Sequence, residues 1–153
     1  MIIDGGTKRE LLMYCHQYVS ERIDRFSNAI ASAQTDANKE TKSSAGDKHE
    51  TSRAMAQLET ENNSKHLNEA HKLKATLGQI DPDKKCEYIE LGALVRTDKG
   101  NYFISVSAGS VDILGELVYF VSVASPIGQH FLGKKVGDGI NINGQNYTIQ
   151  EIG

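Results

Sequence analysis

Two acidic side chains, Asp47 and Glu50, stand three residues apart in the stretch GDKHE at positions 46–50. The stretch lies between two long segments of helical periodicity, so we expect it at an exposed turn. Oxygen ligands such as carboxylates suit Mg²⁺, and two carboxylates at an exposed turn could be inserted into a cavity of a partner. Because Mg²⁺ keeps most of its waters and two acids hold it poorly, that partner would have to supply the remaining ligands.

The same pair has a purely structural interpretation. An acid followed three residues later by Glu is a capping-box pattern, and both acids favour the positive end of the helix dipole. His49 lies between them and could join a transition-metal cluster, although no cysteine is near. Lys48 and His49 could contact a phosphate or simply be solvated. The spacing alone favours the structural interpretation.

Two segments of helical period must position this pair. Apolar or small residues recur at spacings of three and four at positions 12, 15, 19, 23, 26, 30, 33 and 37. A second register comprises Met55, Leu58, Ala70, Leu73, Leu77 and Ile80, with a polar interruption at 62–66. Two helices of about 30 residues joined by a short turn pair antiparallel. Residues 1–80 are therefore predicted to form an antiparallel coiled-coil helical hairpin with its acidic tip at 46–50.

The C-terminal part has a different period. After a linker at 81–87, the β-branched and aromatic runs EYIELGALVRT, NYFISVS and LVYFVSV predict strands of an antiparallel sheet. Ser125 and Pro126 supply an N-cap and first residue for a short helix that ends at Gly133. Asn143-Gly144 predicts a type I′ hairpin. The expected class is α+β, with residues 88–153 as a compact β domain that contains one short helix.

Charge and cysteine content exclude several functions. The net charge is −3, and residues 81–153 carry six basic and nine acidic side chains, so neither part has the basic excess expected of a duplex-DNA-binding protein. Cys15 and Cys86 form no disulfide or catalytic motif, and there is no cationic, apolar leader, which predicts a cytoplasmic location. No apolar run reaches the roughly 18 residues that span a bilayer, so no membrane role is expected.

Taken together, these features resemble the Gre transcript-cleavage factors of bacteria. The matching stretches are GDKHE at 46–50, at the turn of the hairpin, and SPIGQHFLGKKVGDGININGQNYTIQEI at 125–152. The resemblance spans the chain from about Leu11 to Ile152. It implies that the C-terminal β domain is FKBP-like.

The resemblance also implies a function. Such a factor enters the secondary channel of bacterial RNA polymerase and lets the polymerase hydrolyse the 3′ end of backtracked nascent RNA. Asp47 and Glu50 would be the catalytic and metal-binding residues that help to hold a second Mg²⁺, shared with the polymerase, and orient the attacking water. The protein would stimulate the nuclease of the polymerase without being an enzyme itself. Its β domain would dock on the channel rim through Ser125, Pro126, Ile127 and His130.

Three alternatives remain open. Gre factors usually have N-A-E-Y after the acid pair, whereas this chain has Thr51, Ser52, Arg53 and Ala54. It could therefore be a Gre-like channel binder that modulates or inhibits transcription without cleavage. The hairpin could instead be a protein-interaction module. FKBP-like folds also include prolyl isomerases, but this chain has no Trp, and its C-terminal aromatic residues mostly occupy strand positions that a core would need.

Overall fold

The computed structural model describes the backbone of residues 1–40 and 46–153, and side chains up to residue 36 and from residue 50. The elements are α1 (Gly5–Glu40), α2 (Gly46–Gly78), β1 (Leu94–Thr97), β2 (Gly100–Ser105), β3 (Gly109–Ile113), β4 (Glu116–Ser122), α3 (Pro126–Phe131), β5 (Gly139–Ile142) and β6 (Gln145–Ile152). The chain divides into two compact units. One comprises Tyr18–Lys74, and the other comprises Met1–Gln17 with Ala75–Gly153.

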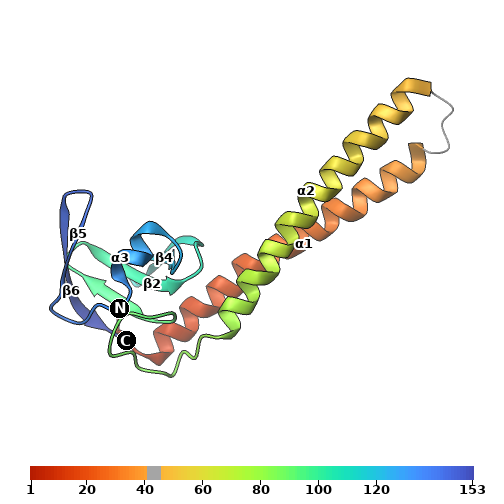
Figure 1. The fold of residues 1–153 in the computed structure, drawn as a ribbon. Helices are drawn as coiled ribbons and strands as arrows, with labels where there is room; N and C mark the ends of the chain where they lie inside the picture. The colour runs from red at the N-terminus through yellow and green to blue at the C-terminus, as the bar shows by residue number, and fades with distance from the viewer. Residues whose placement is uncertain (41–45) are drawn as a thin grey trace. The chain divides into compact units, whose positions relative to one another are not determined.

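Within the unit Tyr18–Lys74, α1 and α2 run antiparallel beside each other (Figure 1). The side chains of α1 that are buried or half-buried here include Val19, Ile23, Phe26, Ile30 and Ala33. Their spacing of three and four residues places them on one face of the helix. The apolar face predicted for the first helix is therefore confirmed up to position 33, and position 37 lies outside the described side chains.

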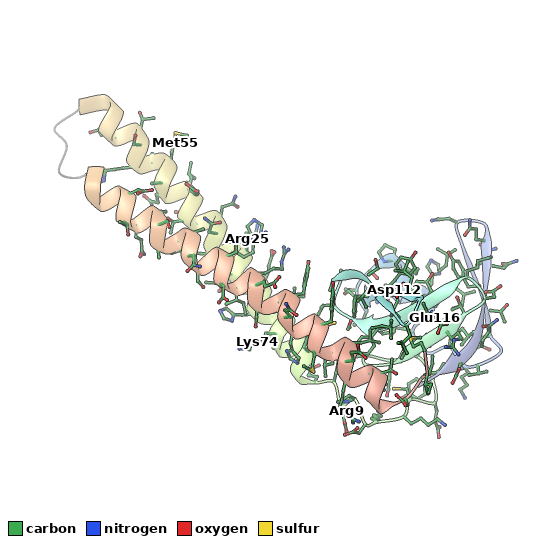
Figure 2. All side chains as sticks on the ribbon, turned by 180° about the vertical axis from the view of Figure 1, so that it is seen from behind. Arg9, Arg25, Met55, Lys74, Asp112 and Glu116 are labelled. Atoms are coloured by element: carbon green, nitrogen blue, oxygen red, sulfur yellow. The ribbon has the colours of Figure 1, made fainter. Side chains whose placement is uncertain are left out.

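The predicted register of the second helix is wrong in its first half. Met55 and Leu58 are 66% and 65% exposed, and Met55 is labelled in Figure 2. The face of α2 that is buried or half-buried comprises Ser52, Ala56, Thr60, Asn63, Leu67 and Ala70. Counting back from Ala70 in steps of three and four leads to these small and polar residues and misses Met55 and Leu58. Position on the helix face, rather than hydrophobicity, therefore decides which side chains of α2 are buried. We call this buried face of α2, together with the apolar face of α1, the seam of the hairpin.

An aromatic stack bridges the polar middle of the hairpin, and two arginines of α1 lie beside it. The Phe26 ring of α1 stacks on the His66 ring of α2 with 5.1 Å between centroids. The guanidinium carbons of Arg22 and Arg25 lie 5.8 Å and 5.0 Å from the Phe26 centroid. Such contacts contribute about 0.5–1 kcal/mol each at exposed sites. Of these contacts, the stack of Phe26 on His66 joins the two helices, whereas both arginines belong to α1 together with Phe26.

The second unit contains a six-stranded sheet in the order β3-β4-β2-β1-β6-β5 (Figure 1). All neighbouring strands pair antiparallel except β2 and β4, which are parallel in the register Phe103 to Phe120. The parallel pair arises because β3, between them in sequence, lies on the outer side of β4. The predicted class, a helical hairpin followed by a mostly antiparallel β domain with one short helix, is confirmed.

Two strand predictions need correction. The strand predicted over 87–97 begins only at Leu94, because the preceding residues form a turn in which Gly92 adopts a φ of 91°. Strand β3 lies in the stretch AGSVDILGE, between the predicted strands NYFISVS and LVYFVSV, and the sequence did not predict it. Exposed polar residues at an edge strand and a two-residue turn gave this segment the composition of a loop.

The short elements near the C-terminus follow their predictions. Ser125 is the N-cap of α3, where its Oγ accepts a hydrogen bond from the Gly128 amide at 3.0 Å, and Pro126 is the first helical residue. Asn143 and Gly144 join β5 to β6 with φ values of 52° and 81°. Positive φ at both positions is the type I′ geometry.

Both faces of the sheet are covered within this unit. Alternate residues of β2 point to opposite faces. Tyr102 and Ile104 belong to a core that includes Phe131 of α3. On the other face, the Cys15 Sγ of α1 lies 3.5 Å from the Ser105 Oγ, and Tyr14 of α1 stacks on Phe120. Burial raises the pKa of the Cys15 thiol, which packs here as a small core residue.

The contact between α3 and the end of β4 generates a prediction. A Cβ added at Gly128 would lie 2.0 Å from the Ser122 carbonyl oxygen, so Gly128→Ala must displace backbone. We expect a loss of about 1–3 kcal/mol in the free energy of unfolding, the usual effect of overpacking. Urea denaturation followed by circular dichroism measures it. Gly139→Ala is the matched control, since nothing lies within 4 Å of its added Cβ. Equal stability of the two variants would contradict the close approach.

Candidate functional site

The acid pair lies in the first turn of α2. This helix begins at Gly46, so Asp47 and Glu50 are both helical, and positions three apart neighbour each other on a helix surface. Asp47 is therefore inside the helix rather than at the N-cap, and position 45 lies outside the described residues. The Glu50 side chain is exposed, whereas those of Asp47, Lys48 and His49 fall outside the described ones. Both acids remain at the positive end of the α2 dipole.

The chain supplies few donors for a metal ion. Among the described residues, no group of three or more His, Cys, Asp or Glu side chains could hold one. The predicted cluster of His49 with Asp47 and Glu50 lies partly outside those residues and stays a prediction. Two carboxylates fit a shared Mg²⁺ whose other ligands come from a partner or from water, because Mg²⁺ is bound through one or two carboxylates in such sites.

A hollow between the two helices follows the acid pair by one turn. It has a volume of about 250 Å³. It is lined by Ala33, Gln34, Arg53, Ala56, Gln57 and Thr60. Small side chains of the seam leave the space, and Arg53 places a cation at its margin. The residue that replaces an acid of the Gre pattern therefore lines a concave surface of the hairpin.

The predicted partner-binding residues lie at α3 and differ in how exposed their side chains are to solvent. Pro126 and His130 are exposed, while Ile127 is half-buried against the core. The Ser125 Oγ donates to the Ser122 carbonyl at 2.6 Å in addition to capping α3. Ser125 thus has a structural role that accounts for both of its hydrogen bonds. Its contact with a partner stays a prediction.

Sequence reasoning missed an aromatic pocket beside α3. Its volume is about 460 Å³. It is lined by Lys99, Tyr102, Gly109, Tyr119, Phe120, Val121, Ile127 and Tyr147. The Tyr102 and Tyr119 rings stack at 5.6 Å, and the Lys99 ammonium lies 5.0 Å from the Tyr147 centroid. The sequence interpretation assigned these aromatic residues to the core, which is right for Tyr102 and Phe120 but not for Tyr119, which is 42% exposed.

The pocket shifts the ionisation of one tyrosine. Burial, with smaller effects of Tyr147 and Tyr119, raises the pKa of Tyr102 to about 12. The hydroxyl is therefore neutral at physiological pH and can both donate and accept hydrogen bonds.

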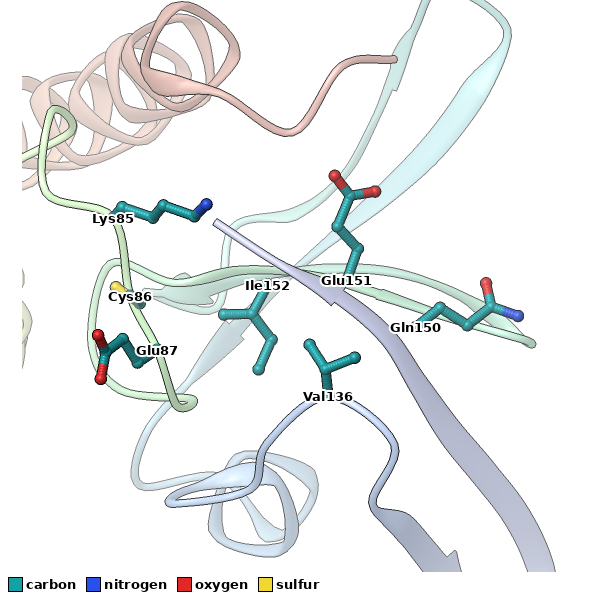
Figure 3. A pocket seen from close by; sticks show the side chains of 7 residues that line it. All are labelled: Lys85, Cys86, Glu87, Val136, Gln150, Glu151 and Ile152. Atoms are coloured by element: carbon teal, nitrogen blue, oxygen red, sulfur yellow. The ribbon is translucent and has the colours of Figure 1, made fainter.

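A second pocket of the same unit contains a thiol (Figure 3). Its volume is about 560 Å³, and it is lined by Lys85, Cys86, Glu87, Val136, Gln150, Glu151 and Ile152. Burial raises the pKa of the Cys86 thiol, and the nearby Lys8 ammonium opposes this shift only in part. A protonated thiol is a weak nucleophile, which agrees with the expectation that Cys86 is not catalytic.

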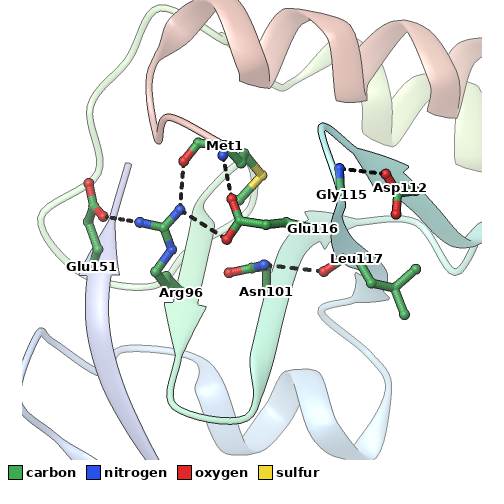
Figure 4. A network of polar contacts seen from close by, with 8 residues as sticks. All are labelled: Met1, Arg96, Asn101, Asp112, Gly115, Glu116, Leu117 and Glu151. Atoms are coloured by element: carbon green, nitrogen blue, oxygen red, sulfur yellow. Dashed lines mark hydrogen bonds and ion pairs between the residues drawn. The ribbon is translucent and has the colours of Figure 1, made fainter.

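Polar contacts around Arg96 join several strands (Figure 4). The Arg96 guanidinium donates to a Glu151 carboxylate oxygen at 3.0 Å and to the Met1 carbonyl at 2.6 Å. It also lies 3.6 Å from the Glu116 carboxylate. These groups are partly exposed, and such ion pairs contribute at most about 1 kcal/mol. We interpret this cluster as structural.

Comparisons with known proteins find a likeness among solved structures. No family model matches the sequence, and no curated protein matches it. A search of solved structures found the transcription factor Gfh1, aligned over 89% of this chain and 91% of that one, with 17% sequence identity and a TM-score of 0.35. A likeness this distant carries no argument about function. No helix in the described parts of the chain is long and apolar enough to cross a membrane.

The pocket generates a prediction about alkaline stability. The folded protein holds the Tyr102 proton more tightly than the unfolded chain, whose tyrosines have the ordinary pKa of 10.0. The contribution of Tyr102 to the free energy of unfolding is therefore fully present below pH 10 and is lost as the pH rises towards 12. Urea midpoints at pH 9 and pH 11.5 should show a smaller loss for Tyr102→Phe than for the wild type. The exposed Tyr88→Phe is the control and should lose as much as the wild type.

Proposed function

We propose that this protein is a cytoplasmic, Gre-like transcription elongation factor that binds bacterial RNA polymerase in its secondary channel and stimulates cleavage of backtracked RNA. The observation that carries the proposal is the position of Asp47 and Glu50 in the first turn of α2, where the hairpin passes from one helix to the other. The resemblance of residues 46–50 and 125–152 to the Gre factors supports it. Gfh1 is a transcription factor, but the proposal rests on residues of this chain.

The hairpin suits insertion into a narrow channel. Two packed helices are about 20 Å across with their side chains, and the seam of small residues keeps them close. Glu50 is exposed at the turn end, so its carboxylate is available to a partner. The positive end of the α2 dipole favours the ionised form of both acids, so they would enter the channel as carboxylates.

In the proposed mechanism, Asp47 and Glu50 accept hydrogen bonds from a water molecule and orient it towards the scissile phosphodiester. A shared Mg²⁺, when bound, would stabilise the attacking and leaving oxygens, while the polymerase holds the other metal ion. The protein itself supplies orientation and charge, and the polymerase supplies the nuclease. It is accordingly not an enzyme on its own.

The β domain would dock on the rim of the channel through α3. Pro126 and His130 offer exposed side chains, and Ile127 lines the aromatic pocket beside them. An apolar pocket next to an exposed helix end suits a side chain of a protein partner. Direct binding of duplex DNA is not part of this function.

A second candidate is a Gre-like channel binder without cleavage activity. Arg53, which replaces an acid of the Gre pattern, lines the hollow one turn after the acid pair. Arg53 is three positions after Glu50 on α2, so a cation there would compete with Mg²⁺ for the Glu50 carboxylate. The two candidates share polymerase binding and differ only in RNA hydrolysis.

The decisive test is RNA release from a stalled, backtracked elongation complex that contains the cognate polymerase. We expect the wild type to stimulate cleavage and Asp47→Asn combined with Glu50→Gln to reduce it by at least about tenfold, which corresponds to 1.4 kcal/mol of transition-state stabilisation. Glu59→Gln, an exposed acid of the same helix, is the control and should cleave normally.

Each result separates the candidates. Binding without cleavage by the wild type would support the non-cleaving regulator and leave the acids a role in helix stability, visible as a loss of about 0.3–1 kcal/mol in the double variant. If the wild type does not bind the polymerase, both candidates fail and the hairpin would be an interaction module for another protein.

The docking residues have their own test. Pro126→Ala combined with His130→Ala should weaken polymerase binding by roughly tenfold, about 1.4 kcal/mol. The free energy of unfolding should fall by less than about 1 kcal/mol, the entropic effect of losing a proline at the first helical position. Fluorescence anisotropy with labelled protein measures the affinity. Lys134→Ala, just beyond α3, is the matched control. Unchanged affinity of the double variant would place the docking surface elsewhere.

A further inference from the structure

The face of the sheet on which α3 packs is only partly covered. Tyr102 of β2 and Tyr119 of β4 are partners in the parallel register, so their side chains lie on the same face. Tyr102 is 7% exposed and packs on Phe131 of α3, with 5.0 Å between the ring centroids. Tyr119 is 42% exposed. The aromatic pocket of about 460 Å³ therefore occupies the part of this face that α3 leaves open.

The size and lining of this pocket suit a small molecule. Pockets for small ligands have volumes of about 300–1,000 Å³ and are lined by apolar and aromatic side chains with a few polar groups. Here Tyr102, Tyr119 and Tyr147 converge from β2, β4 and β6, and Ile127 of α3 lies beside them. The stacked rings of Tyr102 and Tyr119 offer a further aromatic ring a surface on which to stack. The ligand that fits has an apolar, planar body.

Lys99 gives the pocket its charge. It is the single charged residue among the eight that line the pocket. None of the ion pairs among the described residues includes Lys99. Its ammonium donates a hydrogen bond to the Asn146 carbonyl and lies over the Tyr147 ring, and both of these partners are neutral. An ammonium has three N–H donors, so two remain for a ligand, and the positive charge has no carboxylate to balance it.

The surroundings of Lys99 favour an anion. Asp98, the adjacent acid in sequence, accepts a hydrogen bond from the Thr148 amide at 2.8 Å and does not line the pocket. The Tyr102 hydroxyl stays neutral at physiological pH, because burial raises its pKa to about 12. A carboxylate in the pocket would therefore meet an ammonium and a neutral hydroxyl without a competing acid. Since the chain as a whole has a net charge of −3, this attraction is local to Lys99.

We propose that the aromatic pocket binds a small organic acid, whose aromatic ring packs on Tyr102 and Tyr119 and whose carboxylate pairs with the Lys99 ammonium. The site consists of residues of this chain alone, so its existence does not depend on the proposed function. One consequence does rest on the proposed function. The acid occupies the space beside Ile127 that a side chain of the polymerase would enter, so the acid and the polymerase exclude each other.

The test titrates the isotope-labelled full chain with three matched probes and follows the amide chemical shifts by NMR. Phenylacetate has a ring and a carboxylate, phenylacetamide has the same ring without charge, and benzylamine has a cation. We expect phenylacetate to bind with a Kd on the order of millimolar, as is usual for a ligand of about ten atoms. It should shift the amides of Gly109, Val121 and Ile127. Phenylacetamide should bind about threefold to fivefold more weakly, and benzylamine more weakly still.

Variants separate the effect of charge from that of shape. Lys99 is exposed, so Lys99→Gln should keep the fold and bind phenylacetate only as tightly as phenylacetamide. Lys99→Arg retains the cation and should keep the preference for phenylacetate. Lys134→Gln, an exposed lysine outside the pocket, is the matched control and should bind as the wild type does. Tyr119→Ala removes one ring and should weaken the binding of both phenylacetate and phenylacetamide.

Three results would overturn the proposal. The first is equal binding of phenylacetate and phenylacetamide by the wild type, which would leave a pocket without a preference for acids. The second is an unchanged preference in Lys99→Gln. The third is no shift of the pocket amides at about 10 mM phenylacetate. None of these results bears on the RNA cleavage test, and a failure of that test would leave the ligand site as proposed.

Discussion

The sheet has two apolar faces, and the need to cover both determines how the chain is divided. Phe131 of α3 covers one face, on which Tyr102 and Ile104 lie. Residues of the first three turns of α1, among them Leu11 and Cys15, cover the other. The N-terminal turns of α1 therefore belong to the same compact unit as the strands, although about 80 residues of sequence separate them. Without these turns, Phe103 and Phe120 would be exposed to water.

The hairpin unit is held together in a different way. Its seam on α2 consists largely of Ala, Ser, Thr and Asn, which bury little apolar area, so hydrophobic stabilisation per turn is low. In the middle, the stack of the Phe26 ring on the His66 ring adds a contact between the two helices. Towards the acid pair, the two helices are separated by a hollow lined by Ala33 and Ala56, so they make fewer side-chain contacts there. The part of the molecule assigned to the chemistry is thus also the part with the least core.

Sequence periodicity predicted which segments form helices and strands better than it predicted which of them pair or pack together. Spacing identified both helices, the α3 cap at Ser125 and the Asn143 turn, because each depends on neighbours in sequence. The parallel pairing of β2 with β4 was not predictable, since it depends on which strand occupies the edge. Met55 and Leu58 were misassigned because the buried Ala70 fixes the register and small residues fill the seam.

The candidate site was predictable to a similar extent. Asp47 and Glu50 were found because their spacing and place between two helices are local properties. The aromatic pocket was not, because Tyr102, Tyr119 and Tyr147 converge only when β2, β4 and β6 are in place. Lys99, in the turn after β1, was the one residue in that region whose charge could have indicated a binding surface.

The pairing of β1 with β6 has a consequence for synthesis of the protein. Val95 pairs with Ile152, so the strand at the middle of the sheet acquires one of its two neighbours only when the last strand has left the ribosome. The residues that Cys15 and Tyr14 of α1 contact, Ser105 and Phe120, lie in β2 and β4 and are made earlier. Long separations in sequence between contacting residues also slow folding. The nascent chain must therefore keep an unpaired edge of β1 until β6 is made, and an unpaired strand edge is open to pairing with another chain.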